Sequence, residues 1–186
     1  MNKDTAKVPQ AEGVYMSERS KELYLSEYAA IRPLSPAENA ELMKRKAAGD
    51  DTAVTRLVEG NMFRVNEAAS CIKGGSRIFM DLVQEGSLAL FMTITEFEEY
   101  DEGFEALLDA RILDAMKAFL EEEEESAKAG QELSDKLNLI DKVCEMLAEK
   151  HGREATAEEV AEIMQMEVDD IRYLMRIALN AIKKEE

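Results

Sequence analysis

Apolar residues along the chain recur at intervals of three and four, which is the spacing of one face of an α-helix. The pattern predicts a first helix at Ser17–Ile31 and a second at Ser35–Ala48. Ser35 and Glu38, with Pro36 between them at the first helical position, form the sequence pattern of a capping box. No period-two run typical of a strand lasts beyond three or four residues, so the chain is predicted to be all-α.

A third helical pattern begins at Asp50 or Asp51. Gly60 is expected to interrupt this helix, because glycine is a poor helix former, and the pattern then continues over 61–71. The glycines within Lys73–Arg77 predict a loop before the next helix.

The stretch Asp81–Phe91 reads D-L-V-Q-E-G-S-L-A-L-F and carries the most specific pattern in the chain. Asp81 is predicted to cap a helix start, with Gln84 three residues on to bond the first-turn amides reciprocally. The helix is predicted to end near Glu96. Its apolar residues form one broad stripe, which leaves an acidic edge near the N-terminal end.

A polar turn and a further helical pattern, Phe104–Leu120, come next. Five consecutive glutamates, Glu121–Glu125, then either extend the helix or form a solvated linker, because like charges four apart weaken a helix without forbidding it. We take this run as the boundary between two domains. The predicted organisation is a flexible tail at 1–16, a helical domain at 17–125 and a small domain at 126–186.

The small domain contains three helical patterns. The first has apolar residues from Leu133 to Leu147 and is ended by His151-Gly152. The pair Thr156 and Glu159 predicts a second capping box, which opens a short helix to Met164. A tight turn and a last helix, Val168–Ile182, follow, so the domain ends in a unit that resembles a helix-turn-helix in outline.

The charge of the chain is unevenly distributed. The formal net charge is −17, and the segment Glu96–Glu125, with 13 acidic and 2 basic residues, carries −11 of it. A charge this negative disfavours binding to free DNA or RNA, because that binding depends on Lys and Arg displacing counterions. It favours basic protein partners instead.

Other chemistry is sparse. Cys71 and Cys144 lie on apolar helical stretches and are predicted to be buried thiols rather than a disulfide. We find no spacing typical of a metal site, no cofactor motif and no catalytic constellation, so an enzyme is not expected. No apolar run approaches the roughly 20 residues of a membrane span, and the N-terminus lacks the apolar core of a signal peptide. We therefore expect a cytoplasmic protein.

Several motifs, in order, resemble those of the sigma-70 family of bacterial transcription initiation factors. D-L-V-Q-E-G-S-L-A-L at 81–90 resembles the family's D-L-I-Q-E-G-N-x-G-L, and N-M-F-R-V at 61–65 is similar to N-L-R-L-V. G-R-E-A-T-A-E-E-V-A-E at 152–162 resembles G-R-E-P-T-P-E-E-I-A-E, which belongs to the three-helix domain after the promoter-melting domain. The likeness extends over Leu23–Ala178.

The resemblance implies that the helix containing Asp81 docks on the clamp region of the largest subunit of RNA polymerase core. Read without the resemblance, the acids of this helix are a cap and a solvated edge, since the helix dipole favours acids near a helix start. The residues implied in docking are Asp81, Gln84, Glu85, Ser87, Leu88 and Met92.

The chain departs from the family where the family contacts promoter DNA. After the residues that match Gly103-Phe104, the family continues R-F-S-T-Y-A-x-W-W-I-R-Q-A-I, and its aromatic and basic residues capture unstacked bases. The tandem tryptophans are here Ile112 and Leu113, which lack a stacking face worth about 1–3 kcal/mol per base, and we expect both to pack inward. The positions that match the family's DNA contacts are Glu105, Ile112, Leu113, Ala115 and Met116.

These features predict a divergent sigma-like factor that binds RNA polymerase core and modulates transcription initiation, with its DNA-reading residues largely lost. DNA would be bound weakly, or only within such a complex. No counterpart of the family's last, promoter-reading domain is expected before Glu186. Two alternatives stay open: a decoy that occupies the polymerase clamp, and a helical adaptor that kept the fold without binding polymerase.

Overall fold

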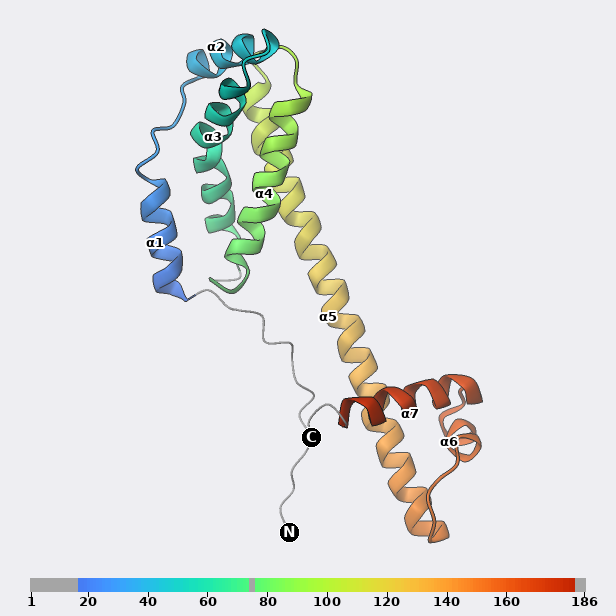
Figure 1. Cartoon of the computed structure of the whole chain (residues 1–186). Coiled ribbons are helices and arrows are strands. Elements are labelled where there is room, and N and C mark those ends of the chain that lie inside the picture. Colours follow the sequence, from blue (N-terminus) through green and yellow to red (C-terminus); the bar gives the residue numbers. More distant parts are fainter. Residues whose placement is uncertain (1–16, 74–75, 183–186) are drawn as a thin grey trace. The chain divides into compact units, whose positions relative to one another are not determined.

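The computed structural model describes residues 17–73 and 76–182 (Figure 1). The predicted tail lies outside these residues, as do Gly74 and Gly75 of the predicted loop. The described residues form helices joined by turns and contain no strand, so the all-α prediction is confirmed. The helices are α1 (Glu18–Tyr28), α2 (Pro36–Ala47), α3 (Asp51–Cys71), α4 (Ser76–Glu96), α5 (Phe104–His151), α6 (Ala157–Met164) and α7 (Val168–Ile182).

The chain divides into two compact units. An N-terminal unit extends to Glu123, and a C-terminal unit begins at Glu124. The first part of α5 belongs to the N-terminal unit and its last part to the C-terminal unit. Each unit has a hydrophobic core of its own.

The first two helices each begin after a serine cap, of which the sequence predicts the one at Ser35. The Ser17 hydroxyl accepts a hydrogen bond from the Ser20 amide, and α1 begins at the next residue. At α2 the Ser35 hydroxyl accepts from the Glu38 amide, while the Glu38 carboxylate accepts from the Ser35 amide at 2.9 Å. The predicted capping box is confirmed. α2 ends ahead of Gly49, whose φ of +89° suits glycine and closes the helix.

α3 continues without a break through Gly60, so the predicted interruption is wrong. The Gly60 carbonyl accepts a hydrogen bond from the Leu34 amide at 3.1 Å. The Leu34 side chain occupies the place where a Cβ on residue 60 would lie. Glycine is therefore needed for the close approach of the segment before α2, and this contact offsets its helix penalty of about 1 kcal/mol.

α4 begins at Ser76, so the predicted cap at Asp81 is wrong: Asp81 lies in the second turn, where its own backbone is helical. Apolar packing stabilises the turn of α4 that precedes Asp81. Phe79 is 1% exposed and meets the Tyr24 ring edge-on, with 5.8 Å between the ring centroids. The Lys21 ammonium lies 4.7 Å from the centre of the Phe79 ring. The predicted end of this helix at Glu96 is confirmed.

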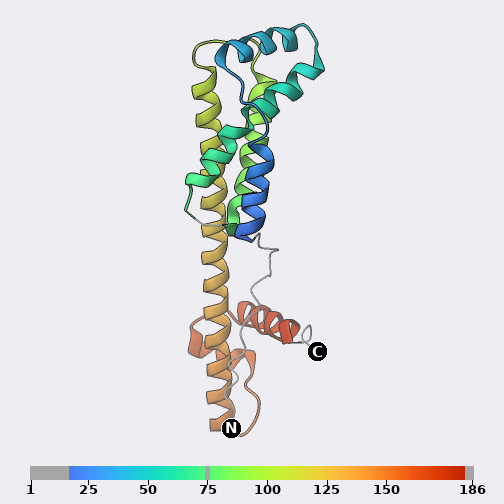
Figure 2. The ribbon, with the colours of Figure 1, turned by 90° about the vertical axis from the view of Figure 1, so that its left-hand side faces the viewer.

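The core of the N-terminal unit lies between α1, α2, α3, α4 and the first part of α5. Figures 1 and 2 show α1, α3, α4 and the start of α5 alongside one another, with α2 across one end. Gly86 permits a close approach of α4 to α3 and α5: a Cβ there would lie 2.9 Å from Val65 Cγ1 and would overlap the Met116 ε-methyl group. The fully buried side chains include Phe79, Phe104, Met43, Leu57, Leu82, Leu90, Ile94, Leu108, Ile112 and Met116.

One helix in the described part of the chain, the segment Ile78–Glu96 of α4, is long and apolar enough to cross a membrane. The expectation that no segment reaches this length is therefore wrong. Leu82, Leu90 and Ile94 of this segment are buried in the core of the N-terminal unit. The length and hydropathy of α4 thus reflect its place as a core helix.

α5 is a single helix, so the two helices predicted before and after Glu121–Glu125 are joined. The glutamate run extends the helix, which decides between the two alternatives left open by the sequence. Every residue over 121–133 is exposed. Because the carboxylates project into water, where salt screens their repulsion, the run weakens the helix without ending it.

The C-terminal unit packs the last part of α5 against α6 and α7. Thr156 and Glu159 form the second capping box as predicted, and the Glu159 carboxylate also accepts two hydrogen bonds from the Arg153 guanidinium. α6 ends at Gln165, which adopts the left-handed conformation with φ +53°. The buried core residues of this unit are Ile140, Val143, Leu147, Val160, Ala161, Ile171 and Leu174.

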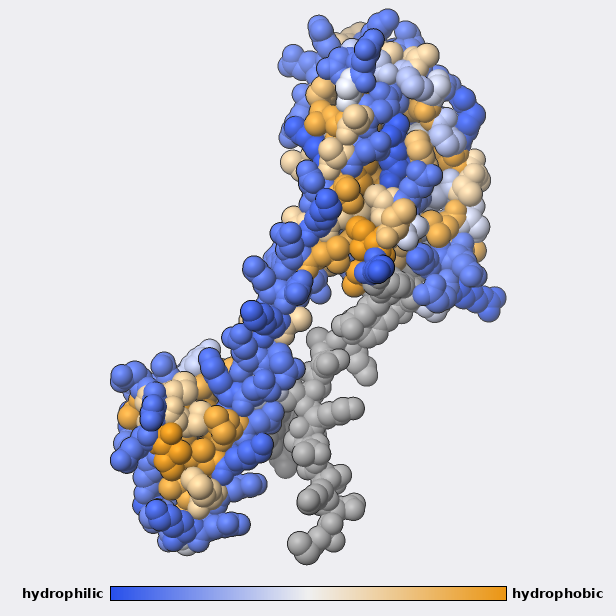
Figure 3. Space-filling view, turned by 180° about the vertical axis from the view of Figure 1, so that it is seen from behind, coloured by the Kyte–Doolittle hydropathy of each residue, from blue (hydrophilic) through white to orange (hydrophobic). Residues whose placement is uncertain are grey.

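Apolar side chains also reach the surface. Figure 3 shows them gathered on a face of each unit, bordered by polar residues.

Both cysteines are free thiols: Cys144 is half-buried, whereas Cys71 is exposed, so the predicted burial is wrong for Cys71. Cys71 is the last residue of α3, where the helix leaves the core.

Candidate functional site

The residues that the resemblance implies in docking lie on α4, and most share one exposed face. Leu88 is 54% exposed and Met92 is 47% exposed, as is the neighbouring Phe91. The opposite side of the helix is buried in the core. Four of the six residues follow one another at helical spacing and are exposed: Asp81, Gln84, Leu88 and Met92. This face of α4 is acidic near its start and apolar near its end.

Glu85 and Ser87 lie closer to the core than the other four, and both are half-buried. The Ser87 hydroxyl donates to the Val83 carbonyl at 2.5 Å and lies 3.6 Å from the sulfur of Met62 on α3. Ser87 is therefore directed at α3, where it helps to fix α4 in the bundle.

Asp81 and Glu85 supply the acidic part of the α4 face. In the part of the chain that the structure describes, neither carboxylate forms an ion pair. Unpaired surface carboxylates attract a basic surface over a distance that shortens as salt increases. The α4 face thus suits a partner with basic and apolar groups side by side.

The residues at the family's DNA-contact positions are mostly engaged inside the N-terminal unit. Glu105 is half-buried, and its carboxylate accepts hydrogen bonds from Asn39 Nδ2 at 3.1 Å and from the Tyr100 hydroxyl at 3.1 Å. Desolvation, and then the hydrogen bond to Glu105, raises the pKa of Tyr100, so the phenol keeps the proton that it donates. Glu105 therefore acts as an internal hydrogen-bond acceptor.

Asn39 and Asn61 connect this cluster to α3. Both side chains are fully buried, and Asn61 Nδ2 donates to Asn39 Oδ1 at 2.9 Å and to the Leu57 carbonyl at 2.9 Å. Buried amides persist in an apolar core only when they are hydrogen-bonded. Asn61 begins the N-M-F-R-V motif. Asn39 belongs to no motif, and its only sign in the sequence is that it is a polar residue within an apolar stripe.

Ile112 and Met116 are buried at 1% and 0% exposure, against α3 and α4 at Gly86. The prediction that Ile112 packs inward is confirmed. The same prediction is wrong for Leu113, which is 36% exposed, because adjacent residues of a helix point about 100° apart and only one of the two can face the core. Leu113 lines a hollow of about 460 Å³ between α3 and α5, and Ala115 is half-buried.

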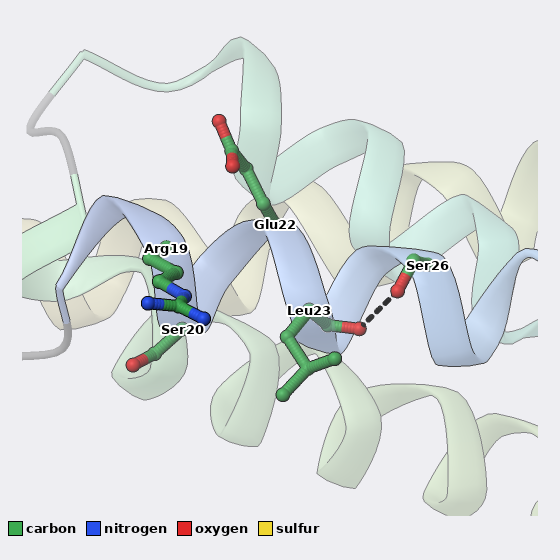
Figure 4. Close-up of a pocket in the computed structure, with 5 residues that line it drawn as sticks. All are labelled: Arg19, Ser20, Glu22, Leu23 and Ser26. Carbon is green, nitrogen blue, oxygen red and sulfur yellow. Dashed lines mark hydrogen bonds between the residues drawn. The ribbon is translucent and has the colours of Figure 1, made fainter.

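A second hollow, of about 470 Å³, lies along α1 and is shown in Figure 4. The Ser26 hydroxyl turns back to donate to the Leu23 carbonyl at 2.7 Å, and Leu23 is 61% exposed. All of its lining residues come from this one helix, so no groups from different elements converge there. They are Arg19, Ser20, Glu22, Leu23 and Ser26.

The family described as Sigma-70 region 3 matches residues 135–183, which cover the last part of α5 and the whole of α6 and α7. A protein of Clostridium acetobutylicum called RNA polymerase sigma factor SigA is 31% identical over 165 residues, or 88% of this chain and 43% of that protein. A Bacillus sp. protein of the same name is 30% identical over 88% of this chain and 44% of its own length.

The chain is therefore similar to proteins of the sigma-70 family over most of its length, as its motifs predict. It spans less than half the length of these two relatives. The matches cover most of both compact units, including α4 and its exposed face.

Proposed function

We propose that the chain is a divergent sigma factor that binds bacterial RNA polymerase core through the exposed face of α4 and modulates transcription initiation. The observation that carries this proposal is the division of α4 into a buried side and an exposed, acidic and apolar side. Leu88, Phe91 and Met92 are exposed within five residues of one another. Clustered apolar exposure of this kind is typical of an interaction surface.

The proposed contact has two parts. Asp81 and Glu85 would meet basic groups, which give orientation and a faster encounter. Leu88 and Met92 would be buried against apolar groups, which supply most of the affinity at the centre of an interface. Similarity to the sigma-70 family supports RNA polymerase core as the partner, and the family likeness of the motif at 81–90 supports the clamp region of its largest subunit.

We further propose that promoter reading is largely lost. Glu105, Ile112 and Met116 are occupied by internal contacts, and Leu113 offers no aromatic face for a base. The exposed run Glu121–Glu125 repels phosphates, so DNA would be bound weakly or only beside polymerase. Because its partner lies in the cytoplasm, the chain would act there.

A decoy that occupies the clamp is the second candidate function. Two features of the N-terminal unit favour it. The α4 face is exposed, while the residues at the positions that match the family's DNA contacts mostly form contacts inside the unit. Such a protein would compete with an active sigma factor for core and would open no promoter.

In-vitro transcription separates these functions. The full chain would be added to purified RNA polymerase core with a promoter template, first alone and then against a primary sigma factor. Promoter opening by the chain alone, read by permanganate reactivity of unpaired thymines, would support the divergent sigma factor. Inhibition without opening would support the decoy.

A matched pair of variants makes the assay specific to α4. Asp81→Lys is expected to weaken either effect, whereas Glu162→Lys, the same charge change on an exposed residue of α6, is expected to retain it. If the wild-type chain neither opens promoters nor competes, the polymerase proposal fails and the adaptor alternative remains.

A further inference from the structure

The C-terminal unit contains a groove of about 420 Å³ that is lined by α5, by α7 and by Glu154 and Ala155 in the segment after α5. Its apolar floor comes from both helices: Ile140 and Cys144 on α5, and Met175 and Ala178 on α7. Cys144 and Met175 are only half-buried, so the floor is open to solvent. This volume lies within the usual range of a binding pocket, about 300–1,000 Å³.

The rim of the groove is acidic. Asp141 and Glu145 lie along its α5 side, and Glu154 lies in the segment after α5; all three are exposed. Among the described residues, none of the three carboxylates forms an ion pair, and the nearby Arg153 guanidinium is engaged by Glu159. Three unpaired negative charges around an apolar floor exclude a nucleic acid and favour a cationic partner.

We propose that this groove is a docking site for an amphipathic helix of a partner protein, with apolar anchors flanked by Lys or Arg. An open apolar groove between two helices receives such a helix through residues spaced by three and four. The unbranched Met175 side chain can adapt to the anchor that enters, as methionines do at binding surfaces. The basic flank would pair with Asp141, Glu145 and Glu154.

The state of Cys144 is consistent with this arrangement. Burial, and then the nearby charge of Asp141, raises the pKa of the Cys144 thiol, so the thiol is neutral at pH 7 and forms part of the apolar floor. The same thiol provides a probe at the site. Cys71, an exposed thiol in the other unit, serves as the internal reference.

The test uses the full chain and a synthetic helix of leucine and lysine, roughly 18 residues or five turns long, with a leucine and glutamate helix of equal length as its counterpart. Binding would be measured by fluorescence anisotropy, and alkylation of each thiol by mass spectrometry. The lysine helix is expected to bind and to slow alkylation of Cys144 by about fivefold or more, since a seated helix covers it, with Cys71 unchanged. The glutamate helix is expected to do neither.

Variants then separate docking from general attraction to an acidic protein. Combining Glu145→Lys with Glu154→Lys should weaken binding of the lysine helix by about tenfold, because two rim contacts become repulsive. The matched control, Glu162→Lys with Glu167→Lys, changes the net charge equally at exposed residues that do not line the groove, and should change binding by less than about twofold.

Equal losses in the rim and control variants, or binding that leaves Cys144 unprotected, would overturn the proposal. Sedimentation of the free chain adds a third outcome. A dimer that the rim variants dissociate would mean that a second copy occupies the groove, which also overturns it. The groove lies in the C-terminal unit and the α4 face in the N-terminal unit, so the two proposals succeed or fail separately.

Discussion

The Arg64 guanidinium of α3 donates hydrogen bonds to both carboxylate oxygens of Asp109 on α5, at 2.7 and 2.8 Å. The Arg64 side chain is 15% exposed and that of Asp109 is 56% exposed. Asp109 lies in the segment that the resemblance aligns with the family's DNA contacts. A cation that could have neutralised a phosphate is thus already engaged by a carboxylate of the same chain.

This ion pair should contribute modestly to stability. One guanidinium nitrogen, Nη1, donates to both carboxylate oxygens and one partner remains in water, so we expect a coupling energy of about 0.5–1 kcal/mol. A double-mutant cycle with Arg64→Met and Asp109→Asn, followed by urea unfolding, measures it. The coupling should shrink between about 50 mM and 500 mM salt. A coupling of zero at the lower concentration would show that the pair contributes nothing to the fold.

The buried pair Asn39 and Asn61 should be more important for stability. Asn61→Ala removes the donor to Asn39 Oδ1 and leaves this buried oxygen without a hydrogen bond. The free energy of unfolding should therefore decrease by about 1–3 kcal/mol. Asn138→Ala, at an exposed position of α5, is the control and should change stability by less than about 0.5 kcal/mol. Equal effects of the two substitutions would mean that the buried network is not stabilising.

Two helical glycines should respond oppositely to alanine. Gly86→Ala adds a methyl group that meets Val65 and Met116, and this overpacking should cost about 1–3 kcal/mol. Gly130→Ala, on the exposed part of α5 with nothing within 4 Å of the new Cβ, should stabilise by about 0.5–1 kcal/mol.

Thermal unfolding of both glycine variants checks these signs. If Gly86→Ala were as stable as Gly130→Ala, then α4 would not pack against α3 and α5 as closely as the structure has it. Met116 can move its ε-methyl group aside, whereas the branched Val65 on α3 cannot, so the cost should come mainly from Val65.

The cap of α2 should make stability depend on pH in the acid range. The hydrogen bond from Arg32, and then those from Ser35, lower the pKa of Glu38 from 4.5 to about 2. Because the folded pKa is depressed, the contribution of Glu38 is complete above the unfolded pKa and is lost as the pH falls from 4.5 toward 2.

Urea unfolding over this pH window tests the role of Glu38. The wild-type chain should lose more stability than Glu38→Gln, while Glu41→Gln, an exposed glutamate on the same helix, should follow the wild type. A Glu38→Gln variant with the same pH dependence as the wild type would contradict the assignment.

Sequence reasoning succeeded where the causes are local. The caps at Ser35 and Thr156 involve side chains and amides within four residues, so their spacing alone identifies them. The start of α4 could not be found in this way, since it depends on Phe79 packing against Tyr24 far earlier in the chain. The predicted interruption of α3 at Gly60 is wrong for the same reason, because the glycine is needed for a contact with Leu34, which lies outside α3.

The candidate site shows the same division. Helical spacing predicts the acidic edge of α4, and the resemblance of the motif at 81–90 adds Leu88 and Met92 as docking residues, but neither predicts that Phe91 is exposed beside them. The engagement of Glu105 by Asn39 and Tyr100 was not predictable, because hydrogen bonds between three separate segments leave no periodic pattern. Leu113 could have been assigned correctly, since helical geometry already separates it from Ile112.

Docking of α4 on RNA polymerase core is tested most directly by equilibrium binding of the labelled full chain to purified core. We expect binding that weakens between about 50 mM and 500 mM salt. The double variant Asp81→Lys with Glu85→Lys should reduce the affinity by about tenfold or more, while Glu162→Lys with Glu167→Lys should leave it unchanged. No binding at the lower salt concentration, or equal binding by both double variants, would contradict docking through α4.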